Sequence, residues 1–377
     1  MNQRNLVVRP ESAVVAAGND SGSVLGRMTG SALAVAREKS ALATVRHRIG
    51  DYEFRDPDYR QIQLWANALS LVPEEVVRRL EATRLEDSWH SGLVTIEFEV
   101  NDGVIVSLAL DLDQLPLKSI FWTNGLLIRR LGIYDCRTQN VSLELNLGEL
   151  NTLWCASIGL SSLDLSRAPK VTELICHLNR LSELDLSPVP DITRLGCGCN
   201  LLTKLDLSPA KKLVYLDCHD NELTALCCAS SPMLREIVCY SNQLAKLDIP
   251  LSPELQKLDC ACNNLKSINL LRMPKLTDLD CSANELSALD LSSVNELLDL
   301  DCRCNELTEL DLSHVPKLKS LDCSHNKLAV LEIPLVPYLR RLICDLGHLR
   351  ELDLSFHSKE SLDVRYPDLT KVIWPSD

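Results

Sequence analysis

Residues 297–317 read LLDLDCRCNELTELDLSHVPK, and this stretch decides the fold. Its pattern, L-x-x-L-x-C-x-x-N-x-L-x-x-L-D-L-S-x-x-P-x, returns every 21 residues through the middle of the chain. A fixed period of this length is typical of a solenoid, in which each unit buries its apolar side only by stacking on its neighbours. Ten ladder cysteines mark the period: Cys155, Cys176, Cys197, Cys218, Cys239, Cys260, Cys281, Cys302, Cys323 and Cys344.

Within one unit, Leu279 and Cys281 lie two residues apart, which is the period of a short strand with both side chains on one face. That face must point into the core, so equivalent strands should stack about 4.8 Å apart as a parallel sheet roughly 45 Å long. The remainder of the unit is too short and too often interrupted by proline for a helix. We therefore expect it to be extended or turn-like.

An asparagine follows eight of the ladder cysteines by three residues. Its amide can donate to and accept from backbone groups that the turn after the strand leaves unpaired, so we expect a structural role. These residues are Asn179, Asn200, Asn221, Asn242, Asn263, Asn284, Asn305 and Asn326.

From about residue 150 to 350, this pattern resembles the bacterial leucine-rich repeats of the short 21-residue class with cysteine in place of the third leucine, also called nested or IRREKO-type repeats. The resemblance implies a leucine-rich-repeat solenoid with a parallel β-sheet on its concave face and an extended or turn-like convex side. It implies a scaffold for protein recognition, and it does not specify the partner.

The flanking segments predict a cap at each end, because a bare terminal repeat would expose the core. We expect a flexible N-terminus (1–21), a helical capping region (22–92) with helices over 22–48 and 56–87, and a β-hairpin with a degenerate first repeat (93–130). The repeats should fill 131–354, and a C-terminal cap 355–377. The predicted first repeat runs through Leu117, Ile120, Trp122, Asn124 and Leu126, and the last strand through Pro367, Leu369, Val372 and Trp374.

Composition limits the classes of partner. Hydrophobic residues make up 46% of the 377-residue chain and the net charge is −13, with 24 Lys and Arg against 35 Asp and Glu in residues 131–377. An acidic body lacks the basic stripe that phosphate binding requires, so nucleic acid and anionic membranes are not expected as partners, and a basic protein or peptide is favoured. The chain shows neither a long apolar run nor a secretory signal, which predicts a cytoplasmic location.

The cysteines are predicted to act as small core residues. Parallel thiols in a row suit neither a tetrahedral metal site nor the Cβ separation of a disulfide. Cys199, Cys262 and Cys304 each follow a ladder cysteine by two residues, and they are too far apart along the stack to share one ion. No cofactor or metal is therefore expected.

The concave face is the predicted binding surface, formed by the positions three and one before and one and two after each ladder cysteine. Its C-terminal half is acidic, although Leu-Asp-Cys is also the repeat template. Its N-terminal half holds aromatic, histidine and arginine side chains that the template does not require. The predicted partner-binding residues are Trp154, His177, Arg194, Tyr215, His219, Tyr240, Asp259, Asp280, Asp301 and Asp322.

No catalytic set is recognisable in the sequence. His219-Asp220 stands as an isolated pair, and no glycine-rich phosphate loop is present. We therefore predict a non-catalytic recognition module that binds a protein or peptide on its concave face. The alternative is a bacterial effector or toxin, exported by a non-classical route into a host cell, whose activity lies in the N-terminal helical region while the repeats select the target.

Overall fold

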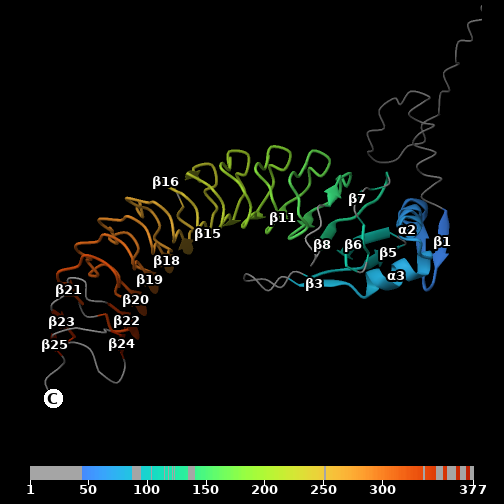
Figure 1. Cartoon of the computed structure of the whole chain (residues 1–377). Coiled ribbons are helices and arrows are strands. Elements are labelled where there is room, and N and C mark those ends of the chain that lie inside the picture. The colour runs from blue at the N-terminus through green and yellow to red at the C-terminus, as the bar shows by residue number, and fades with distance from the viewer. Residues whose placement is uncertain are drawn as a thin grey trace, which may run out of the picture. The chain divides into compact units, whose positions relative to one another are not determined.

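The computed structural model describes residues 45–86, 95–102, 104–113, 115–117, 119–120, 122, 124–134, 141–249, 252–333, 336–344, 351–354, 362–365 and 371–373. Residues Arg46–Asp377 form one compact unit. Within it, fourteen strands form one sheet that lines the inside of a curve, as Figure 1 shows. All neighbours in this sheet are parallel except the antiparallel pair at its N-terminal edge.

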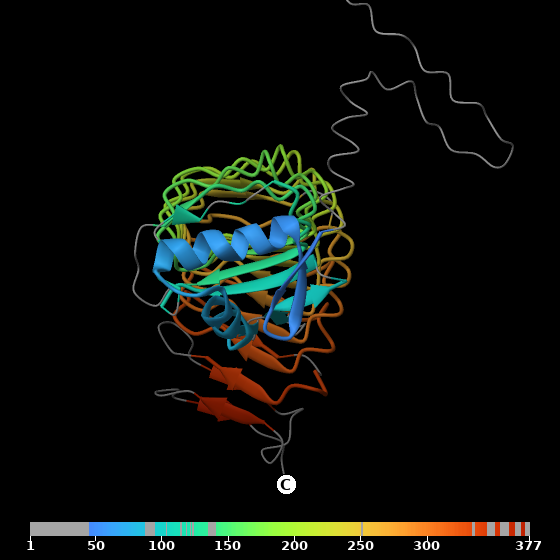
Figure 2. The ribbon, with the colours of Figure 1, turned by 90° about the vertical axis from the view of Figure 1, so that its right-hand side faces the viewer.

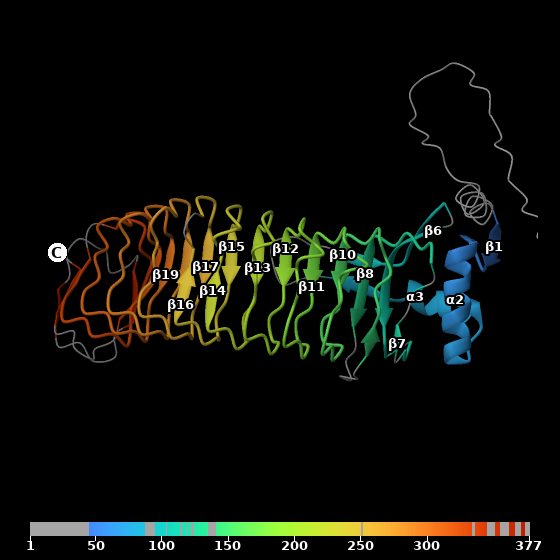
Figure 3. The same cartoon turned by 90° about the horizontal axis from the view of Figure 1, so that it is seen from above.

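The strands of the main sheet are short and follow one another at the repeat period (Figure 3). From β10 to β22, adjacent strands pair leucine with leucine or isoleucine, as at Leu279 and Leu300, so the register follows the sequence period directly. In chain order they are β5 (Glu99–Asn101), β6 (Val104–Asp111), β8 (Arg130–Tyr134), β10 (Thr152–Trp154), β11 (Glu173–Ile175), β12 (Arg194–Gly196), β13 (Tyr215–Asp217), β15 (Glu236–Val238), β17 (Lys257–Asp259), β18 (Asp278–Asp280), β19 (Asp299–Asp301), β20 (Ser320–Asp322), β22 (Arg341–Ile343) and β24 (Asp363–Arg365).

The opposite side of the stack is turn-like, with strand pairing in three short groups among the described residues. This outcome confirms the expectation of extended or turn-like connections, because the described part of the repeats contains no helix there. The groups are β7 (Ser119–Ile120) with β9 (Ser142–Leu143), β14 (Ala225–Cys227) with β16 (Lys246–Asp248), and β21 (Leu331–Glu332), β23 (Glu351–Asp353) and β25 (Lys371–Ile373).

The ladder cysteines lie in the core between the two sides, each at most 2% exposed. They are free thiols, and burial raises the pKa of Cys176 to about 12, so such a thiol stays protonated at neutral pH. They pack there as small apolar groups, as the sequence predicts.

The asparagines join neighbouring repeats through their amides. Asn263 Nδ2 donates to the carbonyls of Cys239 (3.0 Å) and Cys260 (3.1 Å), and Asn263 Oδ1 accepts from Leu244 N–H (2.9 Å). Each of those carbonyls also accepts from a second asparagine, since Asn242 donates to Cys239 and Asn284 donates to Cys260. The result is a continuous buried hydrogen-bonded row, and the predicted structural role is confirmed.

Among the described residues, two helices and three antiparallel strand pairs close the N-terminal end, where α2 lies across the stack in Figure 2. α2 (Asp56–Leu69) begins with a proline in its first turn, as predicted, and α3 (Pro73–Glu81) begins at the next proline. Trp65 of α2 packs edge-on against Trp122, with ring centroids 5.8 Å apart. The Asp58 carboxylate accepts a hydrogen bond from Ile105 N–H of β6 (3.0 Å), which ties the helix to the main sheet.

The predicted helix ranges in this region are partly wrong. Residues Arg46–Ile49 form β1, which pairs with β2 (Tyr52–Arg55) around Gly50, because the alternating side chains bury Ile49 and Phe54 on one face. Residues Arg84–Glu86 form β3, which pairs with β4 (Thr95–Glu97). Residues 22–44 lie outside the described part of the chain.

Both predicted terminal repeats are also misplaced. Ile120 lies in β7, on the side opposite the main sheet, and the main sheet instead continues through Leu131 of β8 and Leu108 of β6. At the other end Val364 pairs with Leu342 in the main sheet, whereas Val372 pairs with Leu352 on the opposite side. The two halves of a degenerate repeat look alike in sequence, which explains both errors. Trp374 lies outside the described residues.

Candidate binding surface on the inner face of the main sheet

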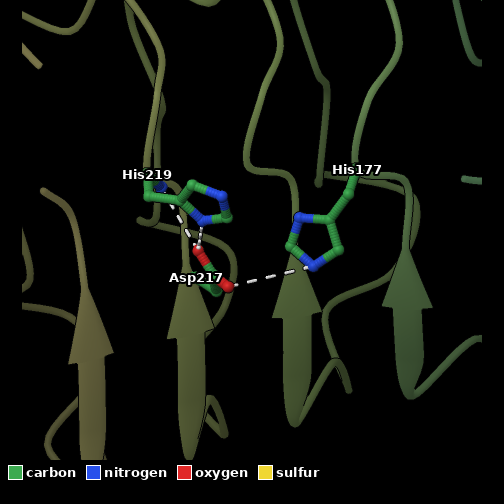
Figure 4. A group of neighbouring side chains, drawn as sticks. All are labelled: His177, Asp217 and His219. Carbon is green, nitrogen blue, oxygen red and sulfur yellow. Dashed lines mark hydrogen bonds and ion pairs between the residues drawn. The ribbon is translucent and has the colours of Figure 1, made fainter. Parts of the chain in front are cut away.

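The inner face is the face of the main sheet turned away from the cysteine core. Along β13 and directly after it, Leu216 and Cys218 are buried in the core, whereas Asp217 and His219 point to the inner face, as Figure 4 shows. Tyr215 lies on the same face, where its hydroxyl meets Asp217. The same alternation occurs in each repeat, so residues at equivalent repeat positions form rows along the inner face. All ten predicted binding residues come from these rows, but they differ greatly in exposure.

At the N-terminal end, part of the inner face is covered. Trp154 is only 7% exposed because it packs against Ile96 of β4 and Ala109 of β6, with Ile175 beside it. Tyr215 is 6% exposed, and the guanidinium of Arg194 lies 4.2 Å from the centre of its ring. The inner-face positions of Trp154 and Tyr215 imply exposed side chains, and this expectation is wrong because both are buried; their predicted role in partner binding stays a prediction.

The middle of the inner face holds a cluster of His177, Asp217 and His219, drawn in Figure 4. His219 Nδ1 lies 2.5 Å from Asp217 Oδ1, and His177 Nε2 lies 3.9 Å from Asp217 Oδ2. The Tyr215 hydroxyl donates to Asp217 Oδ2 (3.3 Å), and the ring of Tyr240 stacks on that of His219 with centroids 4.7 Å apart.

The cluster shifts the titration of its own members. Burial alone would raise the pKa of Asp217, but the His219 hydrogen bond and the charges of both histidines outweigh it and lower that pKa. Burial likewise opposes the charged form of His219, yet the hydrogen bond and charge of Asp217 raise the pKa of His219. The carboxylate thus shifts the titration of the ring towards its protonated form, and the ring shifts that of the carboxylate towards its ionised form.

Two glycines make room for the histidine rings. A Cβ on Gly198 would lie 2.4 Å from His219 Cε1 and 3.0 Å from His177 Nδ1, and a Cβ on Gly196 would lie 2.4 Å from His177 Nε2. Any other residue at either position would displace a ring. The Gly198 N–H donates to His177 Nδ1 (2.8 Å), so the glycine backbone also orients that ring.

Beside this cluster, Cys199 and Asp220 approach the other nitrogen of His219. Cys199 Sγ lies 3.3 Å from His219 Nε2 and 3.8 Å from Asp220 Oδ2, and His219 Nε2 lies 3.9 Å from Asp220 Oδ2. His219 is therefore not part of an isolated His-Asp pair, as the sequence suggested, but links Asp217 to Cys199. Burial and the Asp220 charge raise the pKa of Cys199 to about 11, which keeps the thiol protonated and argues against an activated nucleophile.

The C-terminal part of the inner face is an acidic groove of about 370 Å³. Aspartates from four successive repeats line it, with three basic side chains among them. The lining residues that bear charge are Asp259, Asp278, Asp280, Asp299, Asp301 and Asp322, with Lys257, Arg303 and Arg341. The four predicted acidic residues are therefore brought together, and Asp278 and Asp299 join them.

Each predicted acidic residue also has a structural function, because one carboxylate oxygen accepts the backbone N–H two residues later. The distances are 3.0 Å at Asp280 and 3.1 Å at Asp301. Burial, then the neighbouring Asp280, raises the pKa of Asp259 to about 6, and burial raises the pKa of Asp301 to about 6. Stacked carboxylates with raised pKa values would be stabilised by a cation in the groove.

Sequence reasoning missed Asp217, Cys199, Asp220 and the two glycines as a local site. The signal was present in the row directly after the ladder cysteines, where His177, Gly198 and His219 follow one another in successive repeats. Only alignment of that row across repeats shows that the glycine separates two histidines.

Residues 253–293 match the family model for leucine rich repeats (2 copies), and no curated protein matches the chain. The functional domain of InlJ from Listeria monocytogenes, described as including a cysteine ladder, is 33% identical with a TM-score of 0.55, covering 61% of this chain and 49% of that one. YopM from Yersinia enterocolitica is 26% identical with a TM-score of 0.56, and the match covers 69% of this chain and 60% of YopM. A leucine-rich-repeat protein of Leptospira interrogans shares the fold at 19% identity, with a TM-score of 0.54, and the match covers 66% of this chain and 68% of that one.

The chain thus spans about half the length of the Listeria structure that it resembles. No helix among the described residues is long and apolar enough to cross a membrane. The matched repeats, the buried cysteine row and the bacterial structures with the same architecture together show that the chain is a leucine-rich-repeat solenoid.

Proposed function

We propose that the protein is a recognition module that binds a basic segment of another protein or a peptide along the inner face. The observation that supports this most strongly is the acidic groove, where six carboxylates from β17 to β20 face three basic side chains. Arg303 lies 3.5 Å from Asp301 and 3.8 Å from Asp322, so part of the acidic charge is already compensated. The remaining excess favours a ligand with lysine or arginine side chains.

The course of the groove across successive repeats also favours an extended peptide chain as the ligand. The groove runs along the sheet and takes one or two acidic side chains from each of four successive repeats. A peptide that runs along the stack can therefore place successive basic side chains against successive repeats. The partly exposed ring of Tyr240 lies further along the same face and offers an aromatic contact.

A pull-down with mass spectrometry tests this proposal with two matched charge reversals. One variant carries Asp280→Lys and Asp299→Lys on the inner face, and the control carries Glu309→Lys and Glu332→Lys at exposed positions on the opposite side. A partner that wild type and control retain but the inner-face variant loses supports the proposal. A partner that all three proteins retain equally contradicts it, provided that circular dichroism shows all three folded.

The alternative of an effector or toxin with an active N-terminal region stays a prediction, as does the cytoplasmic location. Removal of residues 1–44 tests the alternative, because an interaction through the inner face does not need those residues. Loss of a cellular phenotype without loss of the captured partner would favour an N-terminal activity.

A further inference from the structure

We propose that Cys199, His219 and Asp220 bind one divalent transition-metal ion, with Zn²⁺ as the expected ion, and that Asp217 positions His219 for this purpose. The thiol, the imidazole and the carboxylate are the three ligand types that zinc takes in proteins. They come from two adjacent repeats and meet at the inner face. The site is separate from the acidic groove and does not rest on partner binding.

The separations between the ligand atoms suit a tetrahedral ion. Bonds of about 2.0 Å to nitrogen and oxygen and about 2.3 Å to sulfur require ligand atoms roughly 3.3–3.5 Å apart. The separations are 3.3 Å between sulfur and nitrogen, 3.8 Å between sulfur and oxygen and 3.9 Å between nitrogen and oxygen. Small side-chain rotations of Asp220, which is half exposed, would close the difference.

The proton on His219 lies on the side that metal binding requires. In the neutral ring the Asp217 carboxylate, 2.5 Å away, fixes the proton on Nδ1, which leaves the Nε2 lone pair directed at Cys199. A carboxylate that accepts from the other ring nitrogen is the usual support of a metal-binding histidine, because it fixes the tautomer and the ring orientation. Asp217 is buried, and it is held in turn by the Tyr215 hydroxyl.

The neighbouring group of His177, Asp217 and His219 is less suited to a metal ion, although its atoms are as close. The Gly198 N–H donates to His177 Nδ1, so the proton of a neutral His177 lies on Nε2 and faces Asp217. Both rings then direct N–H groups at this carboxylate. The group is a hydrogen-bonded support, and the open ligand positions lie on the other side of His219.

The repeat template does not account for these residues. Cys262 occupies the same repeat position as Cys199 and makes the same backbone hydrogen bond to the next repeat, yet Ser282 and Ala283 stand there in place of His219 and Asp220. Gly198 is also specific to this place, because a Cβ would lie 2.4 Å from the His219 ring. Cys262 is therefore a natural control for Cys199 within the same chain.

Binding releases the thiol proton of Cys199, and a His219 ring that is protonated on both nitrogens also releases its Nε2 proton. The metal takes Cys199 as a thiolate, so the sulfur–hydrogen bond breaks, a sulfur–metal bond forms and the proton passes to solvent or buffer. No oxidation or reduction takes place. The three protein ligands leave a fourth position for water or for a group of a bound partner, and affinity should rise with pH because a proton is released.

Cobalt titration of the full, reduced chain tests the proposal, because Co²⁺ replaces Zn²⁺ and reports its ligands by absorption. We expect one equivalent of Co²⁺ to give thiolate-to-metal charge-transfer bands and the intense d–d bands of a four-coordinate site, and Zn²⁺ to displace them. Cys199→Ser and His219→Gln should abolish the charge-transfer bands, whereas Cys262→Ser should leave them unchanged. Asp217→Asn should weaken Co²⁺ binding by about 10–100-fold, as expected for loss of a supporting carboxylate.

Two results would overturn the proposal. One is a wild-type chain without the charge-transfer bands under these conditions. The other is equal spectra in wild type and Cys199→Ser, which would place the metal elsewhere. As a second readout, saturating Zn²⁺ should slow alkylation of Cys199 by iodoacetamide by at least tenfold and leave the rate at Cys262 unchanged. Equal protection of both thiols would exclude a site built around Cys199.

Discussion

Replacing Asn263 with alanine should destabilise the solenoid, whereas the same change at its neighbour Asn264 should not. The Asn263 side chain is buried, with Nδ2 bonded to three carbonyls and Oδ1 to the Leu244 N–H. Asn264 is exposed, and only its backbone N–H is bonded to the stack. Both variants remove the same amide in the same turn.

The magnitude follows from what each group keeps after the change. The carbonyls of Cys239, Cys260 and Ala261 retain a second donor, from Asn242, Asn284 and the Ser241 N–H respectively. The Leu244 N–H loses its acceptor inside the core, which costs about 1–3 kcal/mol, and the three weakened carbonyls together add about 1 kcal/mol. We therefore expect Asn263→Ala to cost about 3 kcal/mol in the free energy of unfolding.

Urea unfolding followed by far-ultraviolet circular dichroism measures this difference. Stability in a repeat protein is spread over neighbouring units, so the two variants should be compared at the first transition that either one shows. A clear fall in the midpoint for Asn263→Ala with an unchanged midpoint for Asn264→Ala is the expected result. Equal midpoints in the two variants would refute the structural role assigned to the asparagine row.

Three further predictions concern single positions. Cys260→Ser should cost about 1–3 kcal/mol because it places a hydroxyl in the apolar core, whereas Cys262→Ser at an exposed site should be neutral in the same urea assay. The pKa of Asp259 is raised from 3.8 to about 6, so the folded chain holds this proton between about pH 4 and 6. The contribution of Asp259 to stability therefore grows as pH falls from 6 to 4 and is lost as pH rises. Asp259→Asn should flatten that part of the plot of unfolding free energy against pH, and an unchanged slope would contradict the shift. Gly198→Ala should push His219 off its carboxylate and bring the raised pKa of that ring back towards 6.5, as NMR titration of the histidine would measure, and an unchanged titration would show that the ring tolerates the Cβ.

The fold of the repeats could be predicted from the sequence because the period leaves little freedom. Once Leu300 and Cys302 share a face and the unit returns every 21 residues, parallel stacking is the arrangement that buries them. Where the period fails, the prediction fails too. Ile120 and Val372 were assigned to the main sheet because each half of a degenerate repeat offers an apolar pair two or three residues apart, and the structure places both on the opposite side.

The binding surface was predictable as a set of rows but not as a site. The sequence predicts that the Trp154 side chain points to the inner face, but it does not predict that Ile96 of β4 packs over that side chain. Likewise, the residue two before His219 is the carboxylate that orients the ring, and the cysteine that faces its other nitrogen comes from the preceding repeat. Such contacts depend on the spacing between stacked strands and on the space left by a glycine, neither of which can be read along a single repeat.

Binding of matched peptides to the acidic groove tests the central claim most directly. Fluorescent peptides of equal length, one rich in lysine and one rich in glutamate, should be titrated against wild type, against Asp280→Asn with Asp299→Asn, and against the control Glu309→Gln with Glu332→Gln. We expect wild type and the control to prefer the lysine peptide, and the inner-face variant to bind it about tenfold more weakly, from two ion pairs of about 0.7 kcal/mol each. An equal affinity of all three proteins for the lysine peptide, or no preference for it over the glutamate peptide, would contradict recognition through the inner face.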